Sequence, residues 1–296
     1  MSRAVSGPEH GTDAPAAAGS LDHELAQLAR FIDRHPRIVL LSGAGLSTAS
    51  GIPGYRDRDG VRRGNAPIQG PEFRRHAAVR QRYWARSMAG WPTLATAEPN
   101  PGHRAIATLE AQGKLTAVVT QNVDGLHQRA GSVHLIELHG SIHAVVCLAC
   151  GTGYTRRFVQ AQLEAANPAP AGPAALPAPD GDAHLEPDPL RPFHVPDCVR
   201  CGGMLKPDVV FFGDGVAPVV AEAAGRALAA ADAMLLVGSS VMVYSSFRLC
   251  RAAAEAGKPI AAINLGMTRA DSLLALKIEQ PAESILPRLL ARRDGA

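Results

Sequence analysis

Short, uninterrupted apolar runs recur along this chain and alternate with helical patterns. Four such runs lie at 38–41, 117–119, 234–237 and 260–263. Apolar runs of this kind are typical of parallel strands that are covered on both faces. Alanine- and leucine-rich stretches that predict helices lie near 103–112, 218–230, 246–256 and 282–292. The alternation predicts right-handed crossovers and an α/β fold with a doubly wound parallel sheet of the Rossmann type.

The same patterns divide the chain into a tail, a large domain and an insert. Residues 1–19 are rich in Ala, Gly, Pro and Ser and lack apolar periodicity, which predicts a disordered tail. Apolar residues at helical spacing follow from Ser20 and stop at Pro36, which predicts an amphipathic helix. The alternation is interrupted between Cys147 and Cys201, and 167–196 is rich in Pro and Ala. We therefore expect a large domain built from 20–146 and 202–296, and a small domain at 147–201 with a long flexible loop.

Composition excludes several classes of protein. The chain has 296 residues, of which 46% are hydrophobic and 19% are charged, as in globular enzymes. No apolar stretch approaches the roughly 20 residues of a membrane span, and the first twenty residues lack the apolar core of a secretory signal. A cytoplasmic monomer without a membrane partner is expected. A net charge of +3 and 4% aromatic residues provide no platform for direct nucleic-acid binding.

Four of the five cysteines form two C-x-x-C pairs, Cys147 with Cys150 and Cys198 with Cys201. Four thiolates are the ligand set of a closed tetrahedral zinc site, which leaves no position for water. The pattern therefore predicts one structural zinc ion in the small domain. A redox pair and a zinc ribbon that binds nucleic acid are the alternatives.

A run of small residues, 43–53, directly follows the first apolar run. Such residues let backbone N–H groups approach a pyrophosphate, which indicates dinucleotide binding. Thr48 takes the place of the third glycine of the G-x-G-x-x-G pattern, and no acidic residue ends a strand about twenty residues later. An ordinary hydride-transfer dehydrogenase is therefore disfavoured, and a tight glycine turn without a ligand is the alternative.

Polar residues at 120–127 follow the second apolar run. We expect them at the carboxyl end of a strand, where open α/β sheets bind ligands. Asn122 and Asp124 suit a carboxamide such as nicotinamide, which has both a donor and an acceptor. His139, which follows another apolar segment, is a candidate general base. A hydrogen-bonded turn and a structural histidine are the plainer interpretations.

Six motifs occur in order along the chain, and from about residue 21 onward it resembles the sirtuin family. These motifs are 43–56, 120–131, 137–141, the two cysteine pairs, 203–213 and 238–240. The runs at 80–86, 90–92 and 268–271 resemble its class II branch. The resemblance implies an NAD-dependent protein lysine deacetylase or deacylase, a transferase that moves an acyl group from lysine to ADP-ribose and releases nicotinamide. Its partners would be acyl-lysine proteins or peptides.

The resemblance also implies roles for individual residues. His139 would be the catalytic base that takes a proton from a ribose hydroxyl, with Asn122 and Asp124 as further catalytic residues. The residues implied in NAD binding are Gly43, Ala44, Gly45, Ser47, Pro53, Tyr55, Arg56, Gln121, Asn122, Asp124, Gly238, Ser239, Ser240, Asn264, Leu265, Gly266 and Ala282. The substrate would add as a strand, and the residues implied there are Val209, Val210, Phe211, Phe212, Gly213, Val241 and Val243.

Two departures bear on activity. Gly54 stands where the family usually has aspartate, so the geometry or mobility of the loop at 45–56, a candidate lid, is expected to differ. Tyr83 and Arg86 have the Tyr-x-x-Arg spacing of sirtuins that prefer succinyl or malonyl groups. Alignment from Trp84 instead places Ala85 and Met88 at those positions, which favours acetyl or longer neutral acyl groups.

Two other functions stay open at this point. Mono-ADP-ribosyl transfer to protein would use the same NAD pocket. An NAD-responsive binding module with weak activity is the second, although a pure binder needs no base beside the ribose.

Overall fold

The computed structural model describes residues 18–57, 59, 61–62, 67–168 and 193–294. The expected tail therefore lies outside the described residues except for Ala18 and Gly19, which begin the first helix. Most of the expected loop at 167–196 lies outside them as well. None of the described helices combines the length and the apolar character that a membrane span requires.

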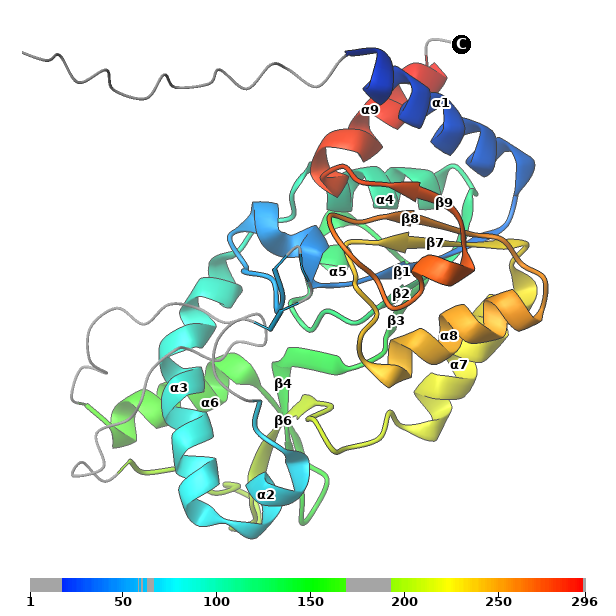
Figure 1. Ribbon diagram of the computed structural model, residues 1–296. Coiled ribbons are helices and arrows are strands. Elements are labelled where there is room, and N and C mark those ends of the chain that lie inside the picture. Colours follow the sequence, from blue (N-terminus) through cyan, green and yellow to red (C-terminus); the bar gives the residue numbers. More distant parts are fainter. Residues whose placement is uncertain (1–17, 58, 60, 63–66, 169–192, 295–296) are drawn as a thin grey trace, which may run out of the picture.

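A six-stranded sheet forms the centre of the larger domain (Figure 1). Its order is β3 (Leu135–Glu137), β2 (Leu115–Thr120), β1 (Ile38–Ser42), β7 (Ala233–Val237), β8 (Ile260–Ile263) and β9 (Leu274–Ile278). Every neighbouring pair is parallel. The predicted doubly wound sheet is confirmed. Because the chain order reverses between β1 and β7, this is the point at which such sheets form a ligand crevice.

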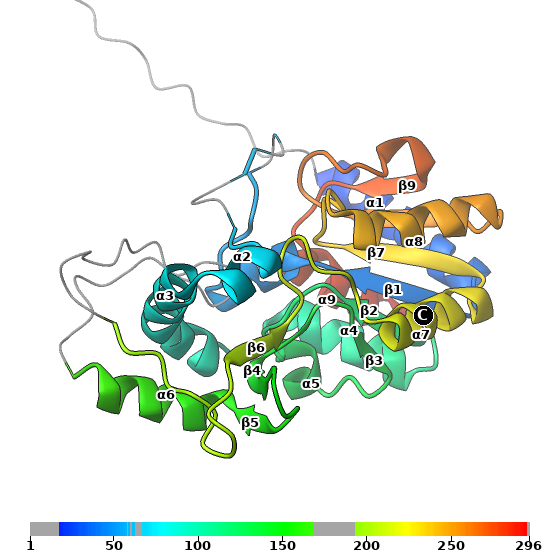
Figure 2. The same cartoon turned by 90° about the horizontal axis from the view of Figure 1, so that it is seen from below.

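Helices cover both faces of this sheet (Figures 1 and 2). On one face lie α1 (Ala18–Arg34), α4 (Pro101–Ala111) and α9 (Ala282–Asp294), and on the other lie α7 (Pro218–Ala230) and α8 (Tyr244–Glu255). Leu40 of β1 packs into the first layer and Leu41 into the second, and both are fully buried. The apolar runs thus follow from strands that bury alternate residues against two helical layers.

A small lobe packs beside the sheet and carries its own apolar core. It contains an antiparallel sheet in the order β5 (Gly153–Thr155), β4 (Gly140–Cys147) and β6 (Leu205–Val209), and the helix α6 (Arg156–Ala166). Two helices from earlier in the chain, α2 (Gly70–Arg75) and α3 (Ala77–Thr96), complete it. The lobe therefore extends beyond the expected insert at 147–201, because β4 begins before Cys147, β6 ends after Cys201, and α3 contributes buried aromatic residues.

A buried arginine joins two helices of the small lobe. Arg156 is fully buried between the rings of Trp84 and Trp91, and its guanidinium donates to the Ser87 carbonyl oxygen at 3.2 Å, which joins α6 to α3. Burial lowers the pKa of Arg156 to about 10.

Asn167 and His194 bracket the long segment between them. The Asn167 amide donates to the His194 carbonyl oxygen, and the His194 N–H donates to Asn167 Oδ1, both at 2.8 Å.

Short elements connect these parts, namely the 3₁₀ turns η1 (Ala44–Ser50) and η2 (Asp271–Leu273) and the helix α5 (Leu126–Ala130). The last strand, β9, had no apolar run to predict it. Residues Leu274–Ile278 include Lys277, and the strand lies at the edge of the sheet. An edge strand is covered less completely than a central one, so its residues need not all be apolar.

Candidate active site

A cavity of about 660 Å³ opens at the carboxyl ends of β1, β2, β7 and β8. The loops after these strands line one side of it, and the segment at 209–213, which follows β6 of the small lobe, lines the other. The cavity therefore lies where the strand order reverses and where the two lobes meet. Both features are typical of ligand sites in α/β proteins.

Two glycine turns form the floor of the cavity by packing backbone against backbone. The N–H of Gly45 donates to the Gly238 carbonyl oxygen at 2.8 Å, and the N–H of Gly43 donates to the Val237 carbonyl oxygen at 3.0 Å. A Cβ atom added at Gly45 would lie 2.8 Å from that Gly238 oxygen. Gly238 has φ of 59°, in the left-handed region, and its added Cβ would collide with the Leu46 nitrogen. This close approach leaves a side-chain-free floor that fits the pyrophosphate of NAD.

Behind this floor, a buried polar cluster joins the loops after β1 and β2. Ser47 Oγ donates to Asp124 Oδ2 at 2.7 Å, and the Leu126 N–H donates to Asp124 Oδ1 at 3.0 Å. The Asn122 amide donates to Ser47 Oγ at 3.0 Å and to the Gly43 carbonyl oxygen at 3.1 Å. Burial raises the pKa of Asp124, while these hydrogen bonds oppose that effect. Asn122 lines the cavity, whereas Asp124 lies behind the lining residues.

His139 lies on the cavity wall just before β4 and makes two hydrogen bonds. Its Nδ1 is 3.1 Å from the Gln121 carbonyl oxygen, and its Nε2 is 2.8 Å from Ser245 Oγ. A carbonyl oxygen only accepts, so Nδ1 carries the proton of the neutral ring and Nε2 carries the lone pair. Burial lowers the pKa of His139, which keeps the imidazole neutral at pH 7. The arrangement is chemically a base whose reactive nitrogen is Nε2.

Two further histidines lie deeper, beneath the ends of β1 and β2. His127 Nε2 is 2.8 Å from Ser42 Oγ, which donates to Thr120 Oγ1 at 2.8 Å. The ring of His103 meets that of His127 edge-on, with centroids 5.1 Å apart. Desolvation lowers the pKa of His127 to about 3 and that of His103 to about 4. Both rings are therefore neutral supports for the strand ends.

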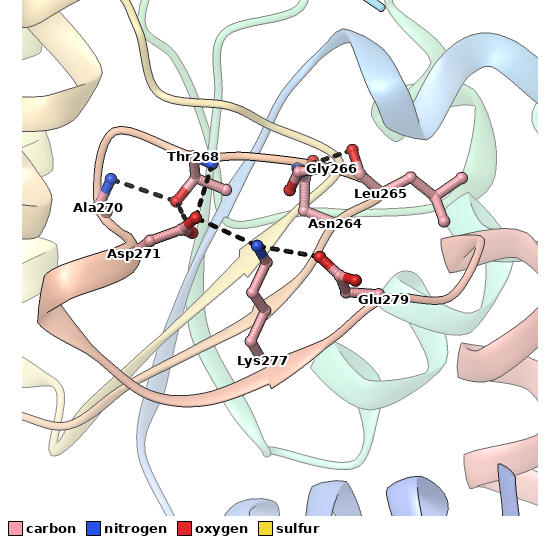
Figure 3. Close-up of polar contacts among 8 residues, drawn as sticks. All are labelled: Asn264, Leu265, Gly266, Thr268, Ala270, Asp271, Lys277 and Glu279. Carbon is pink, nitrogen blue, oxygen red and sulfur yellow. Dashed lines mark hydrogen bonds and ion pairs between the residues drawn. The ribbon is translucent and has the colours of Figure 1, made fainter. Parts of the chain in front are cut away.

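The turn after β8 forms the far end of the cavity (Figure 3). The Asn264 amide donates to the carbonyl oxygens of Leu265 and Gly266, at 3.1 and 3.2 Å. Thr268 Oγ1 donates to Asp271 Oδ1 at 2.6 Å, and Figure 3 shows Lys277 between two carboxylates. Its Nζ lies 3.2 Å from Asp271 Oδ2 and 3.0 Å from Glu279 Oε1.

This turn also fixes the loop after β7, at 238–243. The Arg269 N–H donates to the Ser240 carbonyl oxygen at 2.9 Å, and the Arg269 guanidinium donates to the Met242 carbonyl oxygen at 3.2 Å. Between those two carbonyls lies Val241, whose φ is 45°. A β-branched residue in the left-handed region is strained, so the surrounding contacts must hold it there. The loop is therefore a rigid wall of the cavity.

Most residues named from the sequence meet at this cavity. Those that line it are Ala44, Gly45, Tyr55, Arg56, Gln121, Asn122, His139, Val209, Val210, Phe211, Phe212, Gly213, Gly238, Ser239, Ser240, Val241, Val243, Asn264, Leu265 and Ala282. Gly43, Ser47, Pro53, Asp124 and Gly266 are not in its lining. Gly43 and Ser47 instead hold Asn122 in place, and Ser47 also bonds Asp124.

The helix α3 contributes Tyr83 to the cavity wall beside the small lobe. Tyr83 lines the cavity, where its ring packs edge-on against Phe211 at 5.1 Å between centroids. Ala85 and Met88 are buried in the lobe and do not line the cavity, and neither does Arg86. The face of α3 that meets the cavity thus carries Tyr83, and which residues contact the acyl chain stays a prediction. Of the Tyr-x-x-Arg pair, Tyr83 lines the cavity and Arg86 does not.

The four paired cysteines form a separate cluster in the small lobe. Their sulfur atoms all lie within 4.8 Å of one another. The Sγ atoms of Cys147 and Cys201 are 3.6 Å apart, and those of Cys150 and Cys198 are 3.8 Å apart. A tetrahedral zinc ion with Zn–S bonds of about 2.3 Å needs sulfurs roughly 3.8 Å apart, so the cluster fits one zinc ion. None of the four lines the cavity, which supports a structural role. The fifth, Cys250, is buried in α8, and burial raises the pKa of its thiol to about 12.

Comparison with known proteins adds to this geometry. The Sir2 family profile matches residues 43–245. An NAD-dependent protein deacetylase 3 of Pseudomonas syringae pv. tomato is 52% identical over 252 residues, 85% of this chain and 90% of that protein. The mitochondrial NAD-dependent protein lipoamidase sirtuin-4 of Bos taurus is 46% identical over 271 residues, 90% and 86% of the two chains. A solved Sir2 structure with a p53 peptide and NAD+ is 26% identical, with a TM-score of 0.73 and coverage of 92% and 99%.

Proposed function

The chain belongs to the Sir2 family, and we propose that it is an NAD-dependent protein deacetylase that acts on acetyl-lysine in proteins and peptides. The observation that carries the proposal is the position of His139. A neutral imidazole with its lone pair at Nε2 lines the same cavity as the glycine floor at Gly45 and Gly238. A site that only binds NAD has no need of a base there.

We propose that the two ends of the cavity hold different parts of NAD. Tyr55, Arg56 and Gln121 line the cavity together with His139 and would bind the nicotinamide-ribose half, with Asn122 and Asp124 as catalytic supports. The turn at 264–266 would bind the adenosine half, and the loop at 238–240 the phosphates. NAD supplies an electrophilic ribose carbon that takes the acyl oxygen as nicotinamide leaves. His139 then accepts a proton from a ribose hydroxyl.

The peptide would enter between the two lobes. The segments 209–213 and 241–243 both line the cavity, and an added strand would pair with their backbone. Main-chain pairing gives affinity with little selection of sequence. Phe211, Phe212 and Tyr83 present apolar surface to the acyl chain, which suits acetyl and longer neutral acyl groups. Such a pocket does not reject longer acyl chains strongly, so we extend the proposal to deacylation.

The small lobe would hold one structural zinc ion at its four cysteines. We also propose that the protein works in the cytoplasm, because four thiols that bind metal need a reducing compartment.

The test is to incubate the purified protein with NAD and lysine peptides that carry acetyl, lipoyl, longer acyl or succinyl groups. O-acyl-ADP-ribose is followed by mass spectrometry. Product is expected with the acetyl peptide, and none with His139→Ala. The matched control is His23→Ala, which removes an exposed histidine of α1 and should keep full activity. ADP-ribosylated protein without any O-acyl-ADP-ribose would refute the proposal in favour of ADP-ribosyl transfer, and bound NAD without turnover would indicate an NAD-responsive binding module.

A further inference from the structure

We propose that the Ser245 hydroxyl is a proton relay between the ribose hydroxyl of the substrate complex and Nε2 of His139. Ser245 Oγ lies 2.8 Å from that nitrogen, and both residues line the cavity. The inference deepens the proposed function and rests on it. Nothing in the spacing of the sequence connects these two residues, which are 106 positions apart.

Only one nitrogen of the neutral His139 ring can receive a proton. Nδ1 is committed to the Gln121 carbonyl oxygen. That peptide is itself held in place, because its N–H, which belongs to Asn122, donates to Thr120 Oγ1 at 3.1 Å. Nε2 is therefore the only basic nitrogen, and the Ser245 hydroxyl donates to it in the neutral ring. A proton that comes from the cavity must pass through Ser245 or displace it.

Ser245 is held firmly in position. It lies in the first turn of α8, and this helix directly follows the rigid loop at 238–243. The Val241 N–H donates to Ser239 Oγ at 3.1 Å, and the Gln121 side-chain amide donates to the same oxygen at 2.7 Å. Gln121 thus holds the His139 ring through its backbone carbonyl and the loop at 238–243 through its side chain. Both partners of the hydrogen bond between Ser245 Oγ and Nε2 are therefore held in place.

The adjacent serine shows that a hydroxyl at this helix start has another option. Ser246 Oγ donates to the Val243 carbonyl oxygen at 2.8 Å, a local contact within the helix start, and it does not line the cavity. Ser245 instead points to the base. The two neighbours therefore provide a matched pair with the same chemistry and different partners.

The proton transfer balances as follows in chemical terms. The ribose O–H bond breaks as its oxygen bonds to the acyl carbon, and the C=N electron pair moves onto the lysine nitrogen. Ser245 Oγ takes the ribose proton and releases its own to Nε2, so the serine is unchanged and His139 becomes an imidazolium. The stored proton passes back through Ser245 to the lysine nitrogen as the amine departs. A water molecule then adds to the acyl carbon and loses a proton to give O-acyl-ADP-ribose, so water is the one further reactant and no oxidant is needed.

The experiment compares Ser245→Ala, Ser245→Thr and Ser246→Ala in two assays. One assay is deacetylation, which needs the base. The other is exchange of labelled nicotinamide into NAD in the presence of acetyl peptide, which tests only the step before the base acts. Ser245→Ala is expected to lower deacetylation by about 10- to 100-fold, in line with loss of part of a general-base effect, and to leave exchange within about twofold. Ser245→Thr should restore deacetylation, and Ser246→Ala should behave as the wild type.

Unchanged deacetylation in Ser245→Ala would overturn the relay, and so would loss of exchange to the same degree as deacetylation. The wild-type protein separately tests the proposed function, because absence of O-acyl-ADP-ribose from it refutes the deacylase itself. In that case ¹⁵N NMR of His139 decides on the contact. The Nε2 resonance is expected to shift in Ser245→Ala and to stay in Ser246→Ala, and an unshifted resonance in Ser245→Ala would overturn the relay.

Discussion

The buried histidine pair beneath the cavity predicts a specific loss of stability in acid. Desolvation holds the pKa of His127 at about 3 and that of His103 at about 4, with a smaller contribution from Arg104 to His103. In the unfolded chain both imidazoles titrate near 6.5. As the pH falls below about 6.5, the unfolded state binds protons that the folded state does not. The stability that the two neutral rings contribute is therefore present above that pH and is lost progressively down toward their folded pKa values.

The magnitude follows from the same values. One imidazole that titrates at about 6.5 only in the unfolded state lowers the free energy of unfolding by roughly 2 kcal/mol between pH 7 and pH 5. His103 and His127 together account for roughly 4 kcal/mol, since at pH 5 both folded rings are still mostly neutral. This is a large part of the stability of a typical domain.

The measurement is the free energy of unfolding in urea at pH 7, 6 and 5, followed by far-ultraviolet circular dichroism. The proteins compared are the wild type, the double variant His103→Gln/His127→Gln and the control His23→Gln. The double variant should be less stable at pH 7 because it loses packing, but between pH 7 and pH 5 it should lose roughly 4 kcal/mol less than the wild type. The control should lose as much as the wild type. Equal losses in the wild type and the double variant would refute the reasoning.

Three further predictions concern the zinc cluster, the cavity end and the first loop. Cys198→Ser should reduce bound zinc from one ion per chain to near zero and lower the Tm, and a metal-free variant with an unchanged Tm would contradict the structural site. Lys277→Met leaves two carboxylates facing each other beside the turn after β8. It should raise KM for NAD by up to about fivefold with little change in kcat, and an unchanged KM would count against that support. Gly54→Ala should keep or slightly raise the Tm, because an added Cβ meets only Arg56 O at 3.6 Å and Thr48 Cγ2 at 3.8 Å; a lower Tm would mean that the loop needs glycine.

The parts of the fold that were predictable are those in which one pattern is enforced by burial. The continuous apolar runs predicted β1, β2, β7 and β8 within one or two residues, because these strands are covered on both faces. The small lobe was harder to predict. α3 buries Tyr83 and Trp84 next to the charged Arg86, and it contains Pro92, so its pattern resembles neither an ordinary helix nor a strand.

The candidate site shows the same division. The spacing of the cysteines was enough to predict their cluster, and polar residues directly after an apolar run predicted Asn122 at the carboxyl edge of the sheet. Gly238 and Asn264 were expected there from the resemblance to the sirtuin family. Contacts between distant loops had no such signal. The pairing of Ser245 with His139 and that of Ser42 with His127 depend on how the strand ends converge, which spacing along the chain does not encode.

The reciprocal hydrogen bonds of Asn167 and His194 have a consequence for engineering. They already bring the two ends of the intervening segment together, so the remainder of the lobe does not depend on how long that segment is. The entropy of closing a loop grows only slowly, by about 0.6 kcal/mol for each doubling of its length. A fluorescent reporter or an affinity module inserted between these two residues should therefore be tolerated, with the metal cluster and the cavity left in place.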